Sequence, residues 1–191
     1  MALQAENERY SFADVLRWDE NERAEIINGE AVMMAPPLTV HQEILAELAR
    51  QLGNFLDGKP CKVFPAPFGV RLFETDGESP ENVDTLVEPD ISVVCDKSKL
   101  DRYGCRGAPD FIAEILSPSS LRHDRLVKLE LYQKAGVREY WIVDPEYKSV
   151  QVFLLDAGGF LRLREEYGSG DIAKVDSLDG CFISLNKVFP E

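Results

Sequence analysis

Short apolar runs alternate with polar, turn-forming stretches along the chain, a pattern that predicts alternating strands and helices. Residues 23–27 and 30–34 flank Asn28-Gly29, a pair that accepts the positive φ angles of a tight turn, so they predict a β-hairpin. A short helix is expected to begin at Ser11, where an S-x-x-D pattern supplies a capping signal.

Two longer helices are predicted from apolar residues at helical spacing. Thr39 with Gln42 three residues later is a capping-box pattern, and it predicts a helix over residues 39–57. The buried stripe of this helix is expected at Ile44, Leu45, Leu48, Leu52 and Phe55. The second helix is expected to end at Gly136. Its inward side chains are expected to be Leu126, Leu129 and Tyr132.

Buried strands are predicted where apolar runs stand between turn residues: 61–64, 70–73, 91–95, 111–116 and 140–143, with a second hairpin formed by 150–155 and 160–166. The second helix is expected to be capped by Ser119 or Ser120. This order predicts an α/β (α+β) fold with one central sheet. Because no repeat or linker interrupts the pattern, residues 1–191 are expected to form a single domain.

Composition narrows the class of protein. With 21 Lys or Arg and 34 Asp or Glu, the 191-residue chain has a formal net charge of −13, which argues against a protein that coats nucleic acid or anionic membranes. No apolar stretch is long enough to span a bilayer, and residues 1–9 lack the pattern of a secretory signal. The cysteines form no CxxC pair, so we expect a cytoplasmic protein with reduced thiols and neither a disulfide nor a zinc framework: Cys61, Cys95, Cys105 and Cys181.

Two carboxylates stand where the predicted strands are otherwise apolar. Asp90 begins the strand at residues 91–95, and Glu114 interrupts the strand at residues 111–116. A buried carboxylate costs several kcal/mol unless it is paired or bound to a cation. Two of them on neighbouring strands suit Mg²⁺, which takes oxygen ligands and assists phosphodiester hydrolysis. The alternative is structural: Glu114 caps a neighbouring backbone group or pairs with an arginine, and Asp90 is only a turn residue at the start of its strand.

A longer pattern carries a resemblance to a known family. It combines VEPDISVV at residues 87–94 and APDFIAEILSPSS at 108–120 with EYWIVDP at 139–145. Further matches are EIINGE at 25–30, His41-Gln42, Asp124, Lys128, Leu131-Tyr132 and AGV at 135–137. Together these residues resemble the Uma-two endonuclease-like family of the PD-(D/E)XK nuclease superfamily, over about residues 12–185.

The resemblance implies a restriction-endonuclease-like core, in which helices flank a central mixed β-sheet and an N-terminal β-hairpin precedes it. It also implies Mg²⁺- or Mn²⁺-dependent cleavage of phosphodiester bonds, with DNA as the substrate. Asp90 matches the motif aspartate and Glu114 the second acid, so both would be metal ligands and catalytic residues. The backbone carbonyl of Ile115 is implied as a third oxygen ligand.

The chain departs from the superfamily pattern where a lysine is expected two residues after Glu114, because Leu116 stands there. That lysine would orient or deprotonate the attacking water. Lys128 on the next helix is the candidate replacement. The alternative is an exposed Asp124–Lys128 pair, which on any helix contributes about 0.2–0.5 kcal/mol and needs no catalytic role.

Other polar residues near the proposed site have a structural and a functional interpretation. Arg122, His123 and Arg125 belong to a solvated helix face or bind phosphate. His41 is interpreted as a helix residue, with Glu43 as a minor candidate for a metal ligand, and Asp144 as a turn cap. Residues 168–173 fit GxGxxA, but no helical period follows, so a turn is predicted there.

Three functions therefore stand beside one another: a DNA endonuclease, a nuclease-fold scaffold without catalysis, and a hydrolase of another phosphoester. Leu116 and the charge of −13 favour the scaffold. Residues 97–138, however, contain nine Lys or Arg and five acids, so the segment around the proposed site is locally basic. Nucleases that cut both strands often pair, which makes a homodimer compatible with this class although no residue indicates one.

Overall fold

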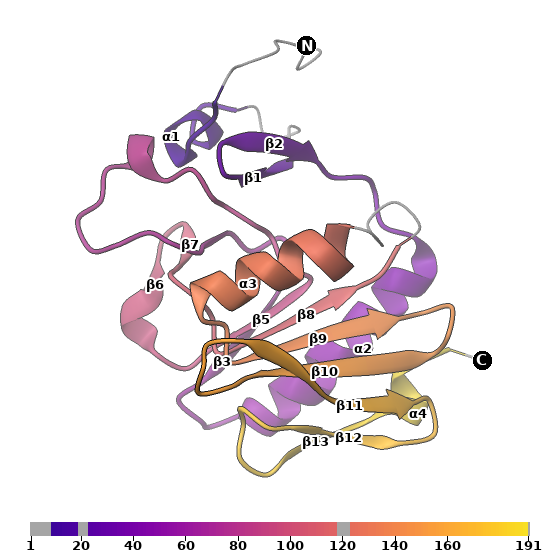
Figure 1. Ribbon diagram of the computed structural model, residues 1–191. Coiled ribbons are helices and arrows are strands. Elements are labelled where there is room, and N and C mark those ends of the chain that lie inside the picture. Colours follow the sequence, from indigo (N-terminus) through magenta and orange to yellow (C-terminus); the bar gives the residue numbers. More distant parts are fainter. Residues whose placement is uncertain (1–8, 19–22, 118–122, 191) are drawn as a thin grey trace.

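The computed structural model describes residues 9–18, 23–117 and 123–190, with the side chains of the last range described from residue 126 onward (Figure 1). A six-stranded sheet lies at its centre in the order β11-β10-β9-β8-β5-β3. Its strands are β3 (Lys62–Pro65), β5 (Ile91–Val94), β8 (Phe111–Ile115), β9 (Glu139–Asp144), β10 (Ser149–Leu155) and β11 (Leu161–Gly168). The β8–β9 pair is parallel and the other pairs are antiparallel, so the sheet is mixed, as predicted.

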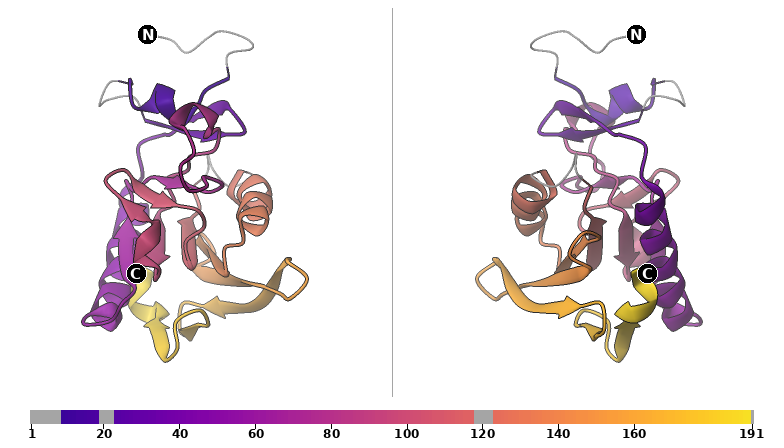
Figure 2. Two further views of the ribbon diagram at one scale, coloured as in Figure 1. Left: turned by 90° about the vertical axis from the view of Figure 1, so that its left-hand side faces the viewer. Right: turned by 90° about the vertical axis from the view of Figure 1, so that its right-hand side faces the viewer.

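Helices cover both faces of this sheet, which explains why its central strands are apolar throughout. Helix α2 (Thr39–Leu56) packs on one face, and α3 (Leu129–Ala135) with the π-helical turn η3 (His123–Lys128) lies on the other (Figure 2). Side chains of β8 alternate accordingly: Phe111, Ala113 and Ile115 join the core under α2, while Ile112 and, directly after the strand, Leu116 join the core under α3. Glu114 stands between those last two residues and therefore projects toward the α3 side.

The start of α2 differs from the sequence prediction. The helix exists over nearly the predicted range, but its N-cap is Leu38, whose side chain makes no capping bond, so the predicted Thr39–Gln42 capping box is wrong. Instead the first turn closes through the backbone, with Gln42 N donating to Leu38 O at 3.1 Å. The predicted stripe is confirmed, since Ile44, Leu45, Leu48 and Leu52 are buried and Phe55 packs against them.

The helix before Gly136 also has a different inner face from the predicted one. Tyr132 is buried and Gly136 ends α3 with φ 85°, as expected, but Leu126 is exposed, so its predicted inward position is wrong. The buried face is the one that carries Tyr132. Lys128, four residues earlier, shares this face, whereas Leu126, six residues earlier, points away from it and is therefore exposed. The predicted caps Ser119 and Ser120 lie outside the described residues.

The N-terminal hairpin is confirmed and forms a small layer above the sheet in Figure 1. It consists of β1 (Ala24–Ile27) and β2 (Glu30–Met33), and Asn28 and Gly29 between them have positive φ angles of 51° and 81°. Ile26 pairs with Leu86 through two backbone hydrogen bonds of 2.8 Å. Beside it, α1 (Phe12–Val15) begins at Ser11, whose backbone N–H donates to Asp14 Oδ2 at 2.8 Å, so the predicted cap is confirmed.

Smaller elements complete the two cores. One three-stranded sheet contains β4 (Val70–Arg71), β6 (Leu100–Asp101) and β7 (Gly104–Arg106), with the short helices η1 (Pro80–Asn82) and η2 (Lys97–Lys99) nearby in sequence. At the C-terminal end, β12 (Ile172–Val175), β13 (Cys181–Ser184) and α4 (Leu185–Val188) close the core under α2. The turn predicted at the GxGxxA match is confirmed, because it joins β11 to β12.

The cysteines correct one prediction. Cys61 and Cys95 form a disulfide, whereas Cys105 and Cys181 are free and buried. The pairing of β3 with β5 places Lys62 opposite Val94, and therefore brings the flanking cysteines together although they are 34 residues apart. Local spacing cannot reveal a cross-strand pair of this kind. Within the described part of the chain, none of the helices has the length and apolarity to cross a lipid bilayer.

Candidate active site

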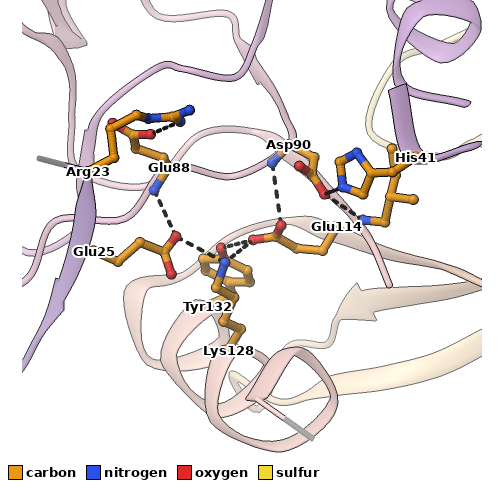
Figure 3. Close-up of polar contacts among 9 residues, drawn as sticks. Arg23, Glu25, His41, Glu88, Asp90, Glu114, Lys128 and Tyr132 are labelled. Atoms are coloured by element: carbon orange, nitrogen blue, oxygen red, sulfur yellow. Dashed lines mark hydrogen bonds and ion pairs between the residues drawn. The ribbon is translucent and has the colours of Figure 1, made fainter. Parts of the chain in front are cut away.

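A cavity of about 620 Å³ lies between the N-terminal hairpin, the start of α2 and the ends of β5 and β8. The four residues proposed from the sequence, Asp90, Glu114, Ile115 and Lys128, all line it. Sheet pairing explains the convergence of the first three, because β5 and β8 are neighbours, and η3 brings Lys128 across the face of β8 (Figure 3).

Asp90 is fixed by contacts with β8, with α2 and with the residue that follows β3. Its Oδ2 accepts one hydrogen bond from Ile115 N at 2.7 Å and lies 3.1 Å from His41 Nε2. Its backbone N–H donates to Glu114 Oε2 at 3.4 Å, and its carbonyl accepts from Ala66 N at 2.9 Å. These contacts hold the carboxylate at the junction of β5, β8 and α2, where it faces the cavity.

Glu114 is buried, with 3% of its surface exposed, and its Oε1 accepts two hydrogen bonds. Lys128 Nζ donates at 2.8 Å and the Tyr132 hydroxyl at 2.5 Å. Leu116 shares this face of β8, but it packs in the apolar core under α3. The position that carries a lysine in the superfamily pattern is thus filled by hydrocarbon, and an ammonium reaches Glu114 from η3 instead.

Lys128 is buried, with 5% exposure, between Glu114 and Glu25, whose Oε1 lies 3.0 Å from its Nζ. Lys128 thus does not lie on an exposed helix face, as the alternative of a surface Asp124–Lys128 pair assumed. The side chains of Asp124, His123 and Arg125, and the whole of Arg122, lie outside the described residues. The buried carboxylates of Glu25 and Glu114 and the ammonium of Lys128 together carry a formal charge of −1.

Glu25 is a residue of the site that the sequence analysis did not select. It lies in β1 and is 3% exposed, and besides Lys128 its Oε1 accepts a hydrogen bond from Glu88 N at 2.9 Å. Glu88 in turn forms an ion pair with Arg23 at the edge of the hairpin. The signal that identified Glu114, an acid within an apolar strand, is also present at Glu25 between Ala24 and Ile26.

Tyr132 is a second residue whose role was missed, since its spacing predicted only core packing. Burial raises the pKa of its phenol well above the usual value, and the negative charges of Glu114 and Glu25 raise it further. The hydroxyl therefore keeps its proton at neutral pH and acts as a donor to Glu114.

His41 has a more specific position than the sequence suggested. It is buried at the start of α2, contacts Asp90 through Nε2, and has a buried Nδ1 without a hydrogen-bond partner among the described residues. Glu43 lies on the exposed side of α2 and does not line the cavity, so the structure does not bring it to Asp90. Asp144 caps a turn as predicted, with Oδ1 accepting from Glu146 N and Tyr147 N at 3.0 and 3.1 Å.

The donor set can be compared with the needs of a metal ion. Within the described residues there is no group of three or more His, Cys, Asp or Glu side chains arranged to hold a metal. Mg²⁺ and Mn²⁺ require less, because one or two carboxylates suffice when waters and substrate oxygens complete the coordination. Asp90 and Glu114 provide hard oxygen donors at one cavity, and thus fit such an ion.

Comparison with known proteins gives the family. A sequence model for Uma2, described as "Putative restriction endonuclease", matches residues 12–186. The chain belongs to the Uma2 family. Restriction-endonuclease-like proteins usually use divalent metals, in agreement with the oxygen donors at this cavity.

Two relatives extend the comparison. The uncharacterized protein slr1290 of Synechocystis sp. is 27% identical over 143 residues, which cover 73% of this Uma2 chain and 71% of the relative. The crystal structure of a "putative nuclease belonging to DUF820" from Anabaena variabilis has a TM-score of 0.71 at 19% identity, and covers 94% of this chain and 97% of that one. This second likeness shows that the Uma2 chain has the same fold as that protein.

Proposed function

We propose that this Uma2 protein is an endonuclease that hydrolyses phosphodiester bonds in DNA with Mg²⁺ or Mn²⁺ as cofactor. The observation that supports the proposal best is the convergence of Asp90, Glu114 and Lys128 at one cavity, in a chain of a restriction-endonuclease family. The nuclease-like fold and the family are established by the comparisons, whereas the metal, the DNA substrate and the residue roles belong to the proposal.

Asp90 and Glu114 would hold the cation, with the carbonyl of Ile115 as a third oxygen. Contacts already in place orient the first two: Ile115 N and His41 hold Oδ2 of Asp90, while Lys128 and Tyr132 hold Oε1 of Glu114. When bound, a divalent cation supplies Lewis-acid stabilisation of charge on the phosphoryl oxygens. The protein contributes a preorganised pair of carboxylates, so little rearrangement precedes binding.

Lys128 would take the role of the motif lysine that Leu116 replaces. Its ammonium lies 2.8 Å from Glu114 Oε1 and lines the cavity, so it can donate a hydrogen bond to a water or phosphate oxygen beside the carboxylates. Glu25 would be a positioning residue, because its carboxylate holds Lys128 from the side opposite to Glu114.

The rival interpretation is a scaffold without catalysis, and Leu116 with the net charge of −13 favours it. A solvent-facing Lys128 would have supported that interpretation further. The enzyme requires the ammonium of Lys128 to lie close to both Asp90 and Glu114; Lys128 is buried with its Nζ 2.8 Å from Glu114 Oε1, which supports the enzyme at one of these two carboxylates.

Metal binding and cleavage test the proposal directly. Titration with Mn²⁺, followed by calorimetry, is expected to show binding that Asp90→Asn and Glu114→Gln each abolish, and that the exposed control variants Asp179→Asn and Glu165→Gln leave unchanged. Plasmid, linear, single-stranded and branched DNA are then incubated with Mg²⁺ or Mn²⁺. Binding independent of both acids would refute the metal site, and no cleavage of any substrate by the native protein would refute the endonuclease.

A further inference from the structure

The segment that joins β2 to α2 is apolar and exposed at the edge of the candidate site. Residues 32–38, with the sequence VMMAPPL, form what we call the apolar rim. Met33 and residues 35–38 are exposed, and the large side chains of Met33 and Leu38 are 59% and 55% accessible. Contiguous exposed apolar patches mark ligand- or protein-binding sites when they are large.

The apolar rim forms one wall of the cavity that contains the carboxylates. All of residues 32–38 line the cavity, together with Asp90, Glu114 and Lys128. A ligand that reaches the two acids is therefore in contact with hydrocarbon on another side.

The cations at this cavity are already engaged. Among the described residues that line it, the Lys and Arg side chains are Arg23 and Lys128. Arg23 forms an ion pair with Glu88, and Lys128 forms ion pairs with Glu25 and Glu114. No Lys or Arg occurs anywhere in residues 24–49, which contain the apolar rim and the start of α2. A duplex presents phosphates at its outer surface and stacks its bases inside, so the apolar rim matches the exposed base faces of an unpaired strand better than the backbone of a duplex.

These observations carry an inference that rests on the proposed endonuclease function. We propose that the apolar rim binds nucleobases, and that the substrate of this site is single-stranded DNA or an unpaired stretch of a strand. Bases present apolar faces that pack on side chains in a sequence-tolerant way, and a base that is already unpaired needs no energy to leave a helix.

The size of the cavity agrees with this substrate. A volume of about 620 Å³ lies in the range of pockets that enclose a small organic ligand, so one nucleotide can enter. A base pair within a duplex would have to separate before its strand could follow the same path to Asp90 and Glu114. A second copy of the chain is the rival occupant of the apolar rim, and it predicts different results in the experiment below.

Binding is measured with Ca²⁺ in place of Mg²⁺, so that affinity is obtained without cleavage. The probes are a fluorescein-labelled single-stranded DNA dodecamer, the same sequence as a duplex, and a strand of equal length whose central nucleotides are abasic. The abasic strand keeps the phosphates and lacks the bases that the apolar rim would contact. Fluorescence anisotropy is expected to show at least about tenfold tighter binding of the normal single strand than of the other two probes.

The variant Met33→Ser/Leu38→Ser removes the two large exposed side chains of the apolar rim. It is expected to weaken binding of the normal strand about tenfold and to leave binding of the abasic strand unchanged, because only apolar contact is lost. Leu38→Ser places a favourable residue at the N-cap of α2, so the fold is expected to tolerate it. The matched control is Ile172→Ser/Phe182→Ser, equally exposed apolar residues on the β12–β13 hairpin at the other end of the molecule (Figure 1).

Three results would overturn the inference: duplex that binds as tightly as the single strand, an abasic strand that binds as well as the normal one, or serine variants with unchanged affinity. A dimer that dissociates in the Met33→Ser/Leu38→Ser variant, measured by sedimentation, would likewise overturn it in favour of a self-association surface. Because binding is measured without cleavage, failure of the endonuclease proposal appears separately, as absence of cleavage of every DNA in Mg²⁺ or Mn²⁺.

Discussion

Lys128 occupies an environment in which a single ammonium serves two carboxylates. Glu114 and Glu25 approach its Nζ at 2.8 and 3.0 Å, from a strand of the central sheet and from the N-terminal hairpin, respectively. Removing one partner from a buried ion pair leaves a charge without compensation, which is strongly unfavourable. Each of the three residues therefore depends on the other two for its orientation.

Glu25→Gln tests whether the contact of Glu25 with Lys128 affects the rate of DNA cleavage. The substitution keeps the size of the side chain and removes its charge, so the ammonium of Lys128 loses its ion pair with Glu25. We expect kcat for DNA cleavage to fall about tenfold with KM nearly unchanged, because the proposed role of Lys128 is realised in the transition state. Glu30→Gln, an exposed glutamate of the same hairpin, is the control. An equal effect of the two substitutions would contradict the positioning role of Glu25.

Tyr132→Phe gives a prediction for the pH dependence of stability. The pKa of the folded phenol is raised, so above about pH 10 the unfolded chain releases this proton while the folded chain retains it. The free energy of unfolding of the native protein should thus fall as pH rises through that range. Tyr132→Phe should lose this component of the fall, and should also lower stability by about 2 kcal/mol through the lost hydrogen bond to Glu114.

Urea denaturation between pH 8 and 11 measures both effects of Tyr132→Phe. Tyr147→Phe serves as the control, because Tyr147 is exposed and its removal should leave the alkaline slope unchanged. A native slope that persists in full after Tyr132→Phe would show that this phenol does not carry the linkage.

At the scale of elements, the ammonium at Glu114 comes from η3, whereas Leu116 directly after β8 is apolar. Leu116→Lys would put an ammonium into the apolar core under α3 while Lys128 already pairs with Glu114, so we expect a loss of about 3 kcal/mol or more. Lys128→Met removes the ammonium that lies between Glu25 and Glu114, with an expected loss of about 3–5 kcal/mol. In the double variant Leu116→Lys/Lys128→Met, the new ammonium can approach Glu114 from the residue after β8. The double variant should therefore lose less stability than the sum of the losses in the two single variants. Strict additivity in urea denaturation would contradict this exchange.

The same elements show what local patterns predict and what they do not. The hairpin, α2 and the central strands follow from apolar periodicity and Asn28-Gly29, because those signals lie within a few residues. Asp90 and Glu114 were identifiable because a buried strand rarely contains an acid. Contacts across the chain were not: Lys128 and Glu25 are 103 residues apart, and His41 and Asp90 are 49 apart. Which face of η3 is buried, and the pairing of Cys61 with Cys95, likewise depend on tertiary packing, which a short stretch of sequence does not reveal.

For the whole molecule, we propose that residues 1–191 form a single restriction-endonuclease-like domain. The chain has 2 tryptophans, which report on different regions: Trp141 lies in the core under α2, and Trp18 packs with the cluster around Phe12 and Ile26. Variants that retain one tryptophan each, Trp18→Phe and Trp141→Phe, should show urea transitions in fluorescence that coincide with the transition in far-ultraviolet circular dichroism of the same variant. A separate, earlier transition at Trp18 would contradict a single domain.

Charge at the whole-molecule scale agrees with a nuclease that engages its substrate locally. A chain of net charge −13 repels a polyanion at long range, so under the proposed function attraction would have to come from the locally basic segment 97–138, the metal and direct contact at the cavity. The homodimer expected from this class of nuclease and the cytoplasmic location stay predictions, and sedimentation measures the first of them.

The contact between Glu25 and Lys128 also determines the order in which the site can assemble during folding. During synthesis the hairpin leaves the ribosome well before η3 exists, so the ammonium can be seated only after the last helix of the site has been made and docked. A fragment that starts after the hairpin would contain Asp90, Glu114 and Lys128 and still lack the group that holds the ammonium from its second side. The ammonium of Lys128 is therefore held on both sides only after the hairpin and η3 have both folded and docked.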